Sequence, residues 1–111
     1  MPKVYVVQQQ LFKDEFGVLV PKFDISAASE YGELVFVLQT GETPNLGTLD
    51  KIRQRMHGIN EDDYLLLMGS PVAMGLVAIV ASEYCAKINI LYWNGKAREY
   101  RVTSFDLEEG Q

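Results

Sequence analysis

Uninterrupted apolar runs alternate with amphipathic stretches along the chain, a pattern that predicts alternating strands and helices. The runs Leu34–Gln39 and Tyr64–Met68 are apolar at successive positions, as expected of strands that are covered on both faces of a sheet. A third run, Lys3–Gln8, is rich in β-branched and aromatic residues and predicts a first strand. The segment that follows it, up to Lys22, indicates no regular element.

Two helices are predicted between these strands, each marked by a hydroxyl residue that caps free backbone N–H groups and by a proline in the first turn. The first covers Thr43–His57, with apolar side chains along one side and charged ones along the other. The second covers Pro71–Tyr84 behind a Ser70 cap and is apolar nearly all round. It must therefore be buried on most sides, by the sheet, by a second copy of the chain, or by both.

Two shorter signals mark turns. Ser26 is placed to cap a short helical turn that Gly32 closes in the left-handed conformation. Near the C-terminus, Ile88–Trp93 and Ala97–Val102 predict two strands that are joined at the Asn-Gly pair 94–95, because both residues of this pair tolerate positive φ.

The succession of strand, helix, strand, helix and strand is typical of right-handed parallel crossovers. We therefore predict an α/β fold of two or three layers, with a parallel βαβαβ core and an antiparallel C-terminal edge hairpin. The 111 residues suit a single domain. Residues 1–22 would supply a strand and a poorly defined segment, residues 23–107 the core, and residues 108–111 a flexible tail.

Composition narrows the class of protein. Ten basic and fifteen acidic residues give a net charge of −5, which opposes attraction to nucleic-acid phosphates. The first ten residues are too polar for a signal peptide or a membrane span. One cysteine, Cys85, allows no internal disulfide and fits a reducing compartment. We expect a cytoplasmic protein that binds neither nucleic acid nor membrane.

A candidate ligand site follows from the predicted fold. The loops after the two apolar strands should meet at one edge of the sheet, where each delivers a helix N-terminus that attracts anions. The residues of this site are Thr40, Gly41, Thr43, Gly69 and Ser70. No glycine-rich phosphate-binding motif accompanies them, and a tight turn with a helix cap also explains the last two.

A candidate partner-binding site lies at the predicted hairpin. Tyr92 and Trp93, with Lys96 and Arg98 across the turn, would form an exposed aromatic and basic spot. The alternative is that strand alternation sends one aromatic of the pair into the core. Both readings remain open.

The sequence indicates no catalytic set, metal site or cofactor. His57 is the only histidine, which excludes a histidine cluster for a metal, and it forms no dyad of recognisable spacing with Cys85. We interpret His57 as a helix-end residue and Cys85 as a core residue.

Three segments, FDISAASEYGELVFVL, DDYLLLMGSPVAMGLVAIVA and INILYWNGKAREYRV, resemble a group of small α/β proteins encoded by tailed bacteriophages. The similarity covers about residues 23–107. The matching positions are Phe23, Asp24, Ser26, Ala28, Glu30, Tyr31, Gly32, Glu33, Leu34, Val35, Gly69, Ser70 and Pro71. The group usually has an acidic or amide residue where this chain has Ser70. The resemblance implies a phage origin and a location in the host cell, and it implies no mechanism.

Our leading functional expectation is a non-enzymatic accessory protein that binds a host or phage protein in the host cytoplasm. A homodimer joined through the hairpin edge or the apolar helix is compatible with it. The alternative is a nucleotide- or phosphate-ester-binding protein, an enzyme included, that uses the helix N-termini near Thr43 and Ser70.

Overall fold

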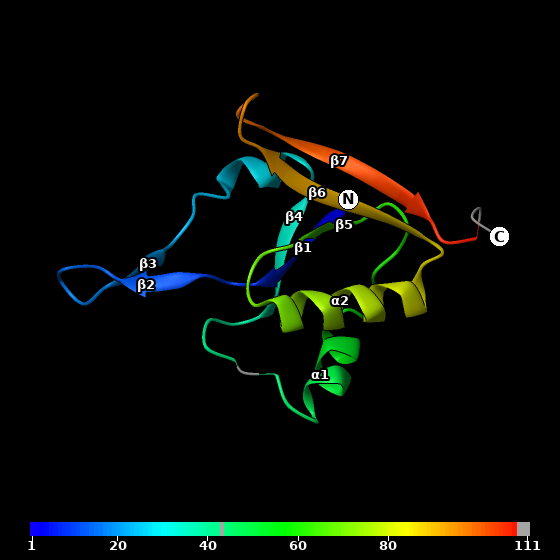
Figure 1. Ribbon diagram of the computed structural model, residues 1–111, viewed down its shortest axis with the longest axis horizontal. Helices are drawn as coiled ribbons and strands as arrows, with labels where there is room; N and C mark the ends of the chain where they lie inside the picture. Colours follow the sequence, from blue (N-terminus) through cyan, green and yellow to red (C-terminus); the bar gives the residue numbers. More distant parts are fainter. Residues whose placement is uncertain (43, 109–111) are drawn as a thin grey trace.

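β1 is an interior strand of a five-stranded sheet in the computed structural model, which describes residues 1–42 and 44–108 (Figure 1). The strand order is β4-β1-β5-β6-β7. The first four strands run parallel, and β7 runs antiparallel to β6. The strands are β1 (Lys3–Gln8), β4 (Glu33–Leu38), β5 (Tyr64–Leu66), β6 (Lys87–Asn94) and β7 (Glu99–Asp106).

This arrangement confirms the predicted α/β fold with a parallel core and an antiparallel C-terminal hairpin. The predicted first strand is confirmed at Lys3–Gln8. It enters the sheet between β4 and β5, so the parallel part has four strands where the sequence predicted three. β1 takes this place because both of its faces are apolar: Val4 and Val6 lie on one face, and Tyr5 and Val7 on the other, all buried.

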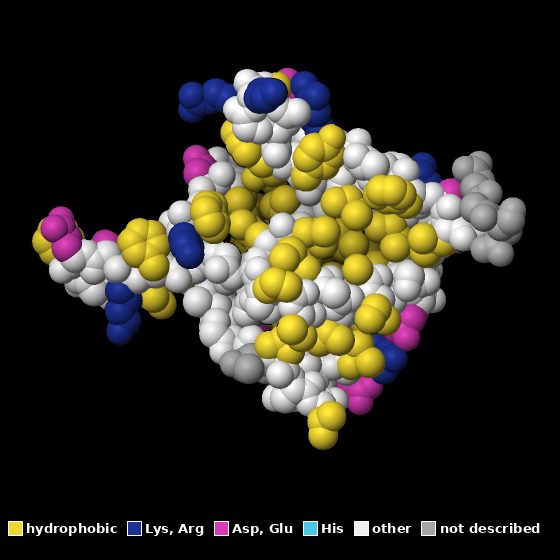
Figure 2. All heavy atoms as spheres, in the orientation of Figure 1, with side chains coloured by type: hydrophobic (Ala, Val, Ile, Leu, Met, Phe, Trp, Pro, Cys, Tyr) yellow, Lys and Arg dark blue, Asp and Glu magenta, His cyan; other side chains and the backbone are white. Residues whose placement is uncertain are grey.

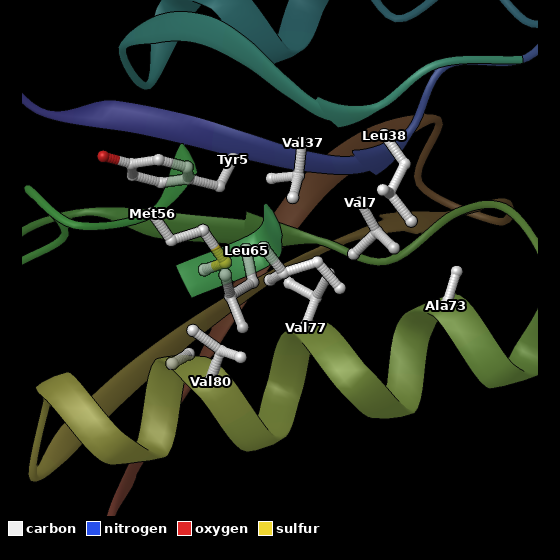
Figure 3. Close-up of a cluster of buried hydrophobic side chains, with 11 residues drawn as sticks. Tyr5, Val7, Val37, Leu38, Met56, Leu65, Ala73, Val77 and Val80 are labelled. Atoms are coloured by element: carbon white, nitrogen blue, oxygen red, sulfur yellow. The ribbon is translucent and has the colours of Figure 1, made fainter. Parts of the chain in front are cut away.

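Two helices cover the same face of the sheet, α1 (Thr48–Arg55) and α2 (Pro71–Tyr84) (Figure 1). The side chains of Val77 and Val80 point from α2 toward the sheet and meet Leu65 (Figure 3). The N-terminus of α2 is the one predicted: Ser70 Oγ accepts a hydrogen bond from Ala73 N (3.1 Å). The described helices include none that is long and apolar enough to cross a bilayer.

The expected burial of α2 on most sides is not met within one chain. Its buried positions follow one side of the helix. Val72 and Ile79 are 61% and 54% exposed. The sheet therefore covers one face of an apolar helix and leaves another open.

A third layer covers the opposite face of β1, β5 and β6. The short 3₁₀ turn η1 (Ser26–Glu30) places Ala28 against Val4, Val6 and Leu66. Tyr31, which follows η1, donates a hydrogen bond from its hydroxyl to the Tyr100 carbonyl on β7 (3.0 Å). The segment of residues 23–32 is thereby tied to β7 at the far edge of the sheet.

The predicted start of the first helix was wrong. α1 begins at Thr48, and Pro44 lies before it. A turn precedes the helix because Asn45 Oδ1 accepts from Gly47 N (2.9 Å) and Thr48 Oγ1 accepts from Asn45 N (2.7 Å). Leu46, in this turn, is fully exposed. Thr43 lies outside the described residues, as does the predicted tail 108–111 apart from Glu108.

The predicted roles of Ser26 and Gly32 were also wrong. Ser26 makes no cap; instead the Asp24 carboxylate accepts from the Ser26 hydroxyl (2.7 Å) and from the Ser26 N–H (3.0 Å). Gly32 is nearly extended, with φ of 159°. Glycine is needed there because a Cβ would overlap the carbonyl of Pro2.

The loop of the C-terminal hairpin has four residues, Gly95–Arg98. The predicted two-residue turn at Asn94 and Gly95 was wrong, since neither residue has a positive φ. Asn94 and Glu99 are the last residues paired, and Arg98 N donates to the Asn94 carbonyl (2.8 Å). The left-handed residue is Arg98, with φ of 55°. Asn94 uses its side chain instead, since Oδ1 accepts from Lys96 N and from the N–H of the next residue.

The segment that indicated no regular element forms a projecting hairpin. β2 (Leu11–Lys13) and β3 (Leu19–Pro21) pair with each other and with no other described strand. Figure 1 shows this hairpin, hereafter the arm (residues 10–22), extending away from the sheet and the helices. Its base is closed by a hydrogen bond from Lys22 N to the Gln10 carbonyl (2.8 Å).

Candidate functional site

An open apolar groove of about 420 Å³ lies beside the carboxyl ends of β5 and β6. Phe23 and Ile25 form one side, and Leu67, Ile90 and Trp93 contribute to the rest. Figure 2 shows hydrophobic side chains gathered in a hollow between the β6–β7 hairpin and α2. Open α/β sheets usually bind their ligands at the carboxyl ends of the strands, which makes this groove the main candidate for a binding site.

The groove exists because neighbouring strands differ in length. Tyr64 to Leu66 on β5 pair with Asn89 to Leu91 on β6, and there β5 ends. β6 continues to Asn94, so Tyr92 and Trp93 extend past the last paired residue of β5. Beyond Leu66 the chain turns through Gly69 into α2 and leaves the side of β6 uncovered.

The two predicted aromatic residues line this groove from opposite faces of β6. Trp93 packs edge-to-face on Tyr100 of β7, with ring centroids 5.1 Å apart. Tyr92 pairs with Arg101 and points to the other face. Tyr92 and Trp93 are 42% and 51% exposed, whereas Tyr100 is buried. The aromatic buried at this end of the hairpin is thus Tyr100, which the sequence had not singled out.

The tip of the hairpin above the groove is basic. Lys96 and Arg98 are exposed in the loop, and Arg101 is exposed on β7, with Glu99 as the one acidic residue among them. Figure 2 shows basic side chains around this tip. On a chain of net charge −5, this is a local reversal of sign. At the opposite side of the groove, the hydrogen bonds from Ser26 lower the pKa of Asp24 and keep it ionised.

The two loops of the predicted anion site lie next to each other, and the side chain of Gln8 bridges them. Gln8, at the end of β1, is 6% exposed. Its Nε2 donates to the carbonyls of Gln39 (3.2 Å) and Glu42 (3.1 Å), and its Oε1 accepts from Ser70 N (3.2 Å). The loops after β4 and β5 therefore lie side by side, as predicted, with the Gln8 carboxamide between them.

The other residues predicted for the anion site have structural partners as well. Thr40 Oγ1 donates to the Gln9 carbonyl (2.6 Å) and accepts from Leu11 N (3.0 Å), which fixes the base of the arm. Gly41 and Gly69 have φ of 82° and 114°. A Cβ on Gly69 would lie 2.6 Å from the Cβ of Gln8, so glycine allows the two loops to approach.

Chemically reactive side chains lie away from the groove. Cys85 is buried, and this burial raises the pKa of its thiol and makes it a poorer nucleophile. His57 packs its ring edge against Tyr84, with centroids 6.4 Å apart. Residues 1–42 and 44–108 contain no group of three or more histidine, cysteine or acidic side chains placed to hold a metal.

Most of the groove was not predicted. Phe23, Ile25, Leu67 and Ile90 come from three separate segments, and each reads locally as an ordinary apolar position. The available signal was one of strand length: β6 is longer than β5 and carries Tyr92 and Trp93 near its end. An overhang of this kind leaves one strand without a neighbour.

The fold and the groove define a class: a small α/β protein whose mostly parallel sheet ends in an overhanging hairpin. A family model described as "Phage Pam3 gp32-like protein" matches residues 2–107. The chain belongs to this family of phage-encoded proteins, which confirms the phage resemblance noted in the sequence. Comparison with curated proteins gave no match, and neither did comparison with solved structures.

Proposed function

We propose that this phage protein is a non-enzymatic accessory protein that acts through protein contacts in the host cytoplasm. The groove would take an apolar segment of another polypeptide, with acidic residues of that segment near Lys96, Arg98 and Arg101. The observation that carries the proposal is the groove itself: half-exposed aromatic side chains on the paired strands of a hairpin, beside a basic tip. Tyrosine, tryptophan and arginine are the residues that most often dominate the energy of protein interfaces.

The groove favours a polypeptide over a small polar ligand. Its lining is almost entirely hydrophobic, with Asp24 as the only charged residue. A nucleotide or phosphate ester would need several donors directed at its phosphate. At the predicted anion site, the Ser70 N–H already donates to Gln8. These contacts support protein binding over the alternative of nucleotide binding.

Affinity capture from phage-infected cells tests the proposal when wild type is compared with two variants. Tyr92→Thr removes a groove aromatic and keeps a strand-forming residue. Leu46→Ser removes an apolar side chain that is fully exposed and does not line the groove. We expect wild type and Leu46→Ser to retain the same protein, and Tyr92→Thr to lose it.

Tryptophan fluorescence supplies the direct readout, because Trp93 is the only tryptophan and it lines the groove. Adding the purified captured protein should shift its emission to the blue as the ring loses water. A thermal-shift screen with nucleotides should leave the melting temperature unchanged. A clear rise with a nucleotide would refute the proposal and favour the phosphate-binding alternative.

A further inference from the structure

The strands of the arm pair with no other described strand, and the apolar side chains toward its tip are exposed. Phe12, Phe16 and Leu19 are 49%, 81% and 59% exposed. A two-stranded hairpin is marginally stable in water by itself and normally packs on something. In Figure 1 the arm points away from the body of the molecule, so its tip does not reach the groove of the same chain.

The tip of the arm is nevertheless held in one shape. Asp14 Oδ1 accepts from Phe16 N (2.8 Å) and Val18 N (2.9 Å), and Gly17 takes a left-handed conformation, with φ of 78°. Phe16 is therefore presented on an ordered loop. A loop whose backbone is held in this way loses little backbone conformational entropy when it docks.

We infer that the arm docks in the apolar groove of a second copy of this chain. This inference rests on the proposed function, since it names the polypeptide segment that the groove takes. The two surfaces are both apolar and aromatic: the arm exposes Phe12 and Phe16, and the groove exposes Tyr92 and Trp93.

Charge complementarity supports a second copy as the occupant. The loop at the end of the arm carries Asp14 and Glu15 and no basic residue. The loop above the groove carries Lys96 and Arg98 and no acidic residue. Figure 2 shows acidic side chains at the far end of the arm and basic side chains at the tip of the β6–β7 hairpin. One chain thus holds both members of a complementary pair, and they lie on different parts of its surface.

The exposed apolar side chains set an upper limit on the size of the contact. For Phe12, Phe16, Val18 and Leu19 of one arm with Phe23, Leu67, Tyr92 and Trp93 of one groove, complete burial would cover roughly 800 Å², taking about 150–250 Å² for a whole aromatic side chain and the exposed fraction of each residue. This equals the area that each partner contributes to an interface of about 1,600 Å². When every arm and every groove is occupied, as in a two-fold dimer or a closed ring, the interface is of ordinary size.

The mass of the wild-type chain in solution is the first test. Light scattering at micromolar concentrations should give two chains, or the number in a closed ring. Phe16→Ser should weaken association by about tenfold or more, because it removes the most exposed aromatic of the arm. Leu46→Ser should not change association. Since Phe16 has little packing to lose, the loss cannot be attributed to unfolding, and circular dichroism of the variant verifies this.

Mixing two variants gives the sharper test. Tyr92→Thr has a damaged groove and an intact arm, and Phe16→Ser has the reverse. Each should be mainly monomeric alone, whereas the mixture should associate through one intact arm-in-groove contact. Trp93 emission should shift to the blue only in the mixture and in wild type.

Three results would overturn the inference: wild type with the mass of one chain, an effect of Phe16→Ser no larger than that of Leu46→Ser, or a mixture that stays monomeric. A monomeric wild type that binds another protein through Tyr92 overturns this inference and leaves the proposed function standing. A chain that self-associates as described but captures other proteins equally well with and without Tyr92→Thr would support this inference and contradict the proposed function.

Discussion

Arg98 occupies a backbone conformation that glycine or asparagine adopts more easily. Its φ of 55° closes the four-residue loop of the β6–β7 hairpin, where its N–H donates to the Asn94 carbonyl. The left-handed conformation costs an L-residue with a Cβ about 1–2 kcal/mol. The arginine side chain at this position is exposed, which agrees with a role for positive charge at the hairpin tip.

Arg98→Gly should raise the free energy of unfolding by about 0.5–1 kcal/mol, since relief of the left-handed conformation exceeds the entropy that glycine adds to the unfolded chain. Lys96→Gly removes the same charge from the same loop at a position without positive φ, so it should be neutral or destabilising. Urea denaturation of both variants makes the comparison. Equal effects would show that charge, and not the backbone, governs the loop.

Gly69 is the second position where one residue decides local geometry. Gly69→Ala should lower the free energy of unfolding by at least about 2 kcal/mol, from a strained φ and from overlap with Gln8. Gly58→Ala is the matched control, because a Cβ there meets nothing within 4 Å and its φ is not positive. Thermal unfolding of the pair should separate them clearly, and a small effect at Gly69 would mean that the two loops can move apart.

At the scale of elements, the contact between β4 and α1 includes a half-exposed, charged corner. Arg55 donates to the Val37 carbonyl (2.7 Å) and to Glu42 Oε1 (3.1 Å). Glu42 Oε1 also accepts from Gln39 N (2.8 Å). The Gln39 N–H, followed by Arg55, lowers the pKa of Glu42 below its ordinary value.

This corner predicts a pH dependence of stability. A carboxylate whose pKa is lower in the folded state contributes stability above its unfolded pKa, and this contribution disappears as the pH falls through the folded pKa. Glu42→Gln should therefore cost up to about 1 kcal/mol at neutral pH and much less at acidic pH, because the half-exposed ion pair is modest. Urea titrations at both pH values test this, and a cost that does not change with pH would contradict the assignment.

Sequence patterns predicted the elements that are governed by local rules. The Ser70 cap with Pro71 placed the start of α2 correctly, and continuous apolar runs placed β1, β4 and β5 within one or two residues. The sequence patterns failed to predict turns and helix starts that depend on hydrogen bonds from a particular side chain. Asn45 displaced the start of α1, Asp24 replaced Ser26 as the hydrogen-bond acceptor, and Asn94 turned a two-residue loop into four.

The candidate sites were predictable only in part, for a related reason. The position of Tyr92 and Trp93 on the hairpin follows from alternation and the Asn-Gly signal. The meeting of the two loops follows from parallel crossovers. The presence of Gln8 between them could not be derived, because it depends on β1 lying between β4 and β5, and strand order is set by long-range pairing.

At the scale of the whole molecule, the arm gives an elongated outline, with extents of 52 × 39 × 25 Å. Its strands pair with no other described strand, so the sheet and helices do not depend on it for their hydrogen-bonded ladder. The base is narrow, since Lys22 N and the Gln10 carbonyl already lie within hydrogen-bond distance.

Replacing residues 12–20 with two glycines should therefore leave the melting temperature of dilute protein within a few degrees of wild type. The melting temperature of wild type should rise with protein concentration, because association stabilises the folded state, and that of the shortened chain should not. Scanning calorimetry at two concentrations measures both quantities. A large loss of stability at high dilution would instead mean that the arm supports the body of its own chain.

The position of β1 between β4 and β5 determines when the molecule can fold during synthesis. The strand made first pairs with β4 and β5, and the Lys3 N–H bonds to the Asp63 carboxylate across a separation of 60 residues. Until that part of the chain has left the ribosome, the apolar faces of β1 have no neighbours and are open to chaperones or to aggregation. Expression yield should thus respond to translation speed and temperature more strongly than the modest size of the chain would suggest.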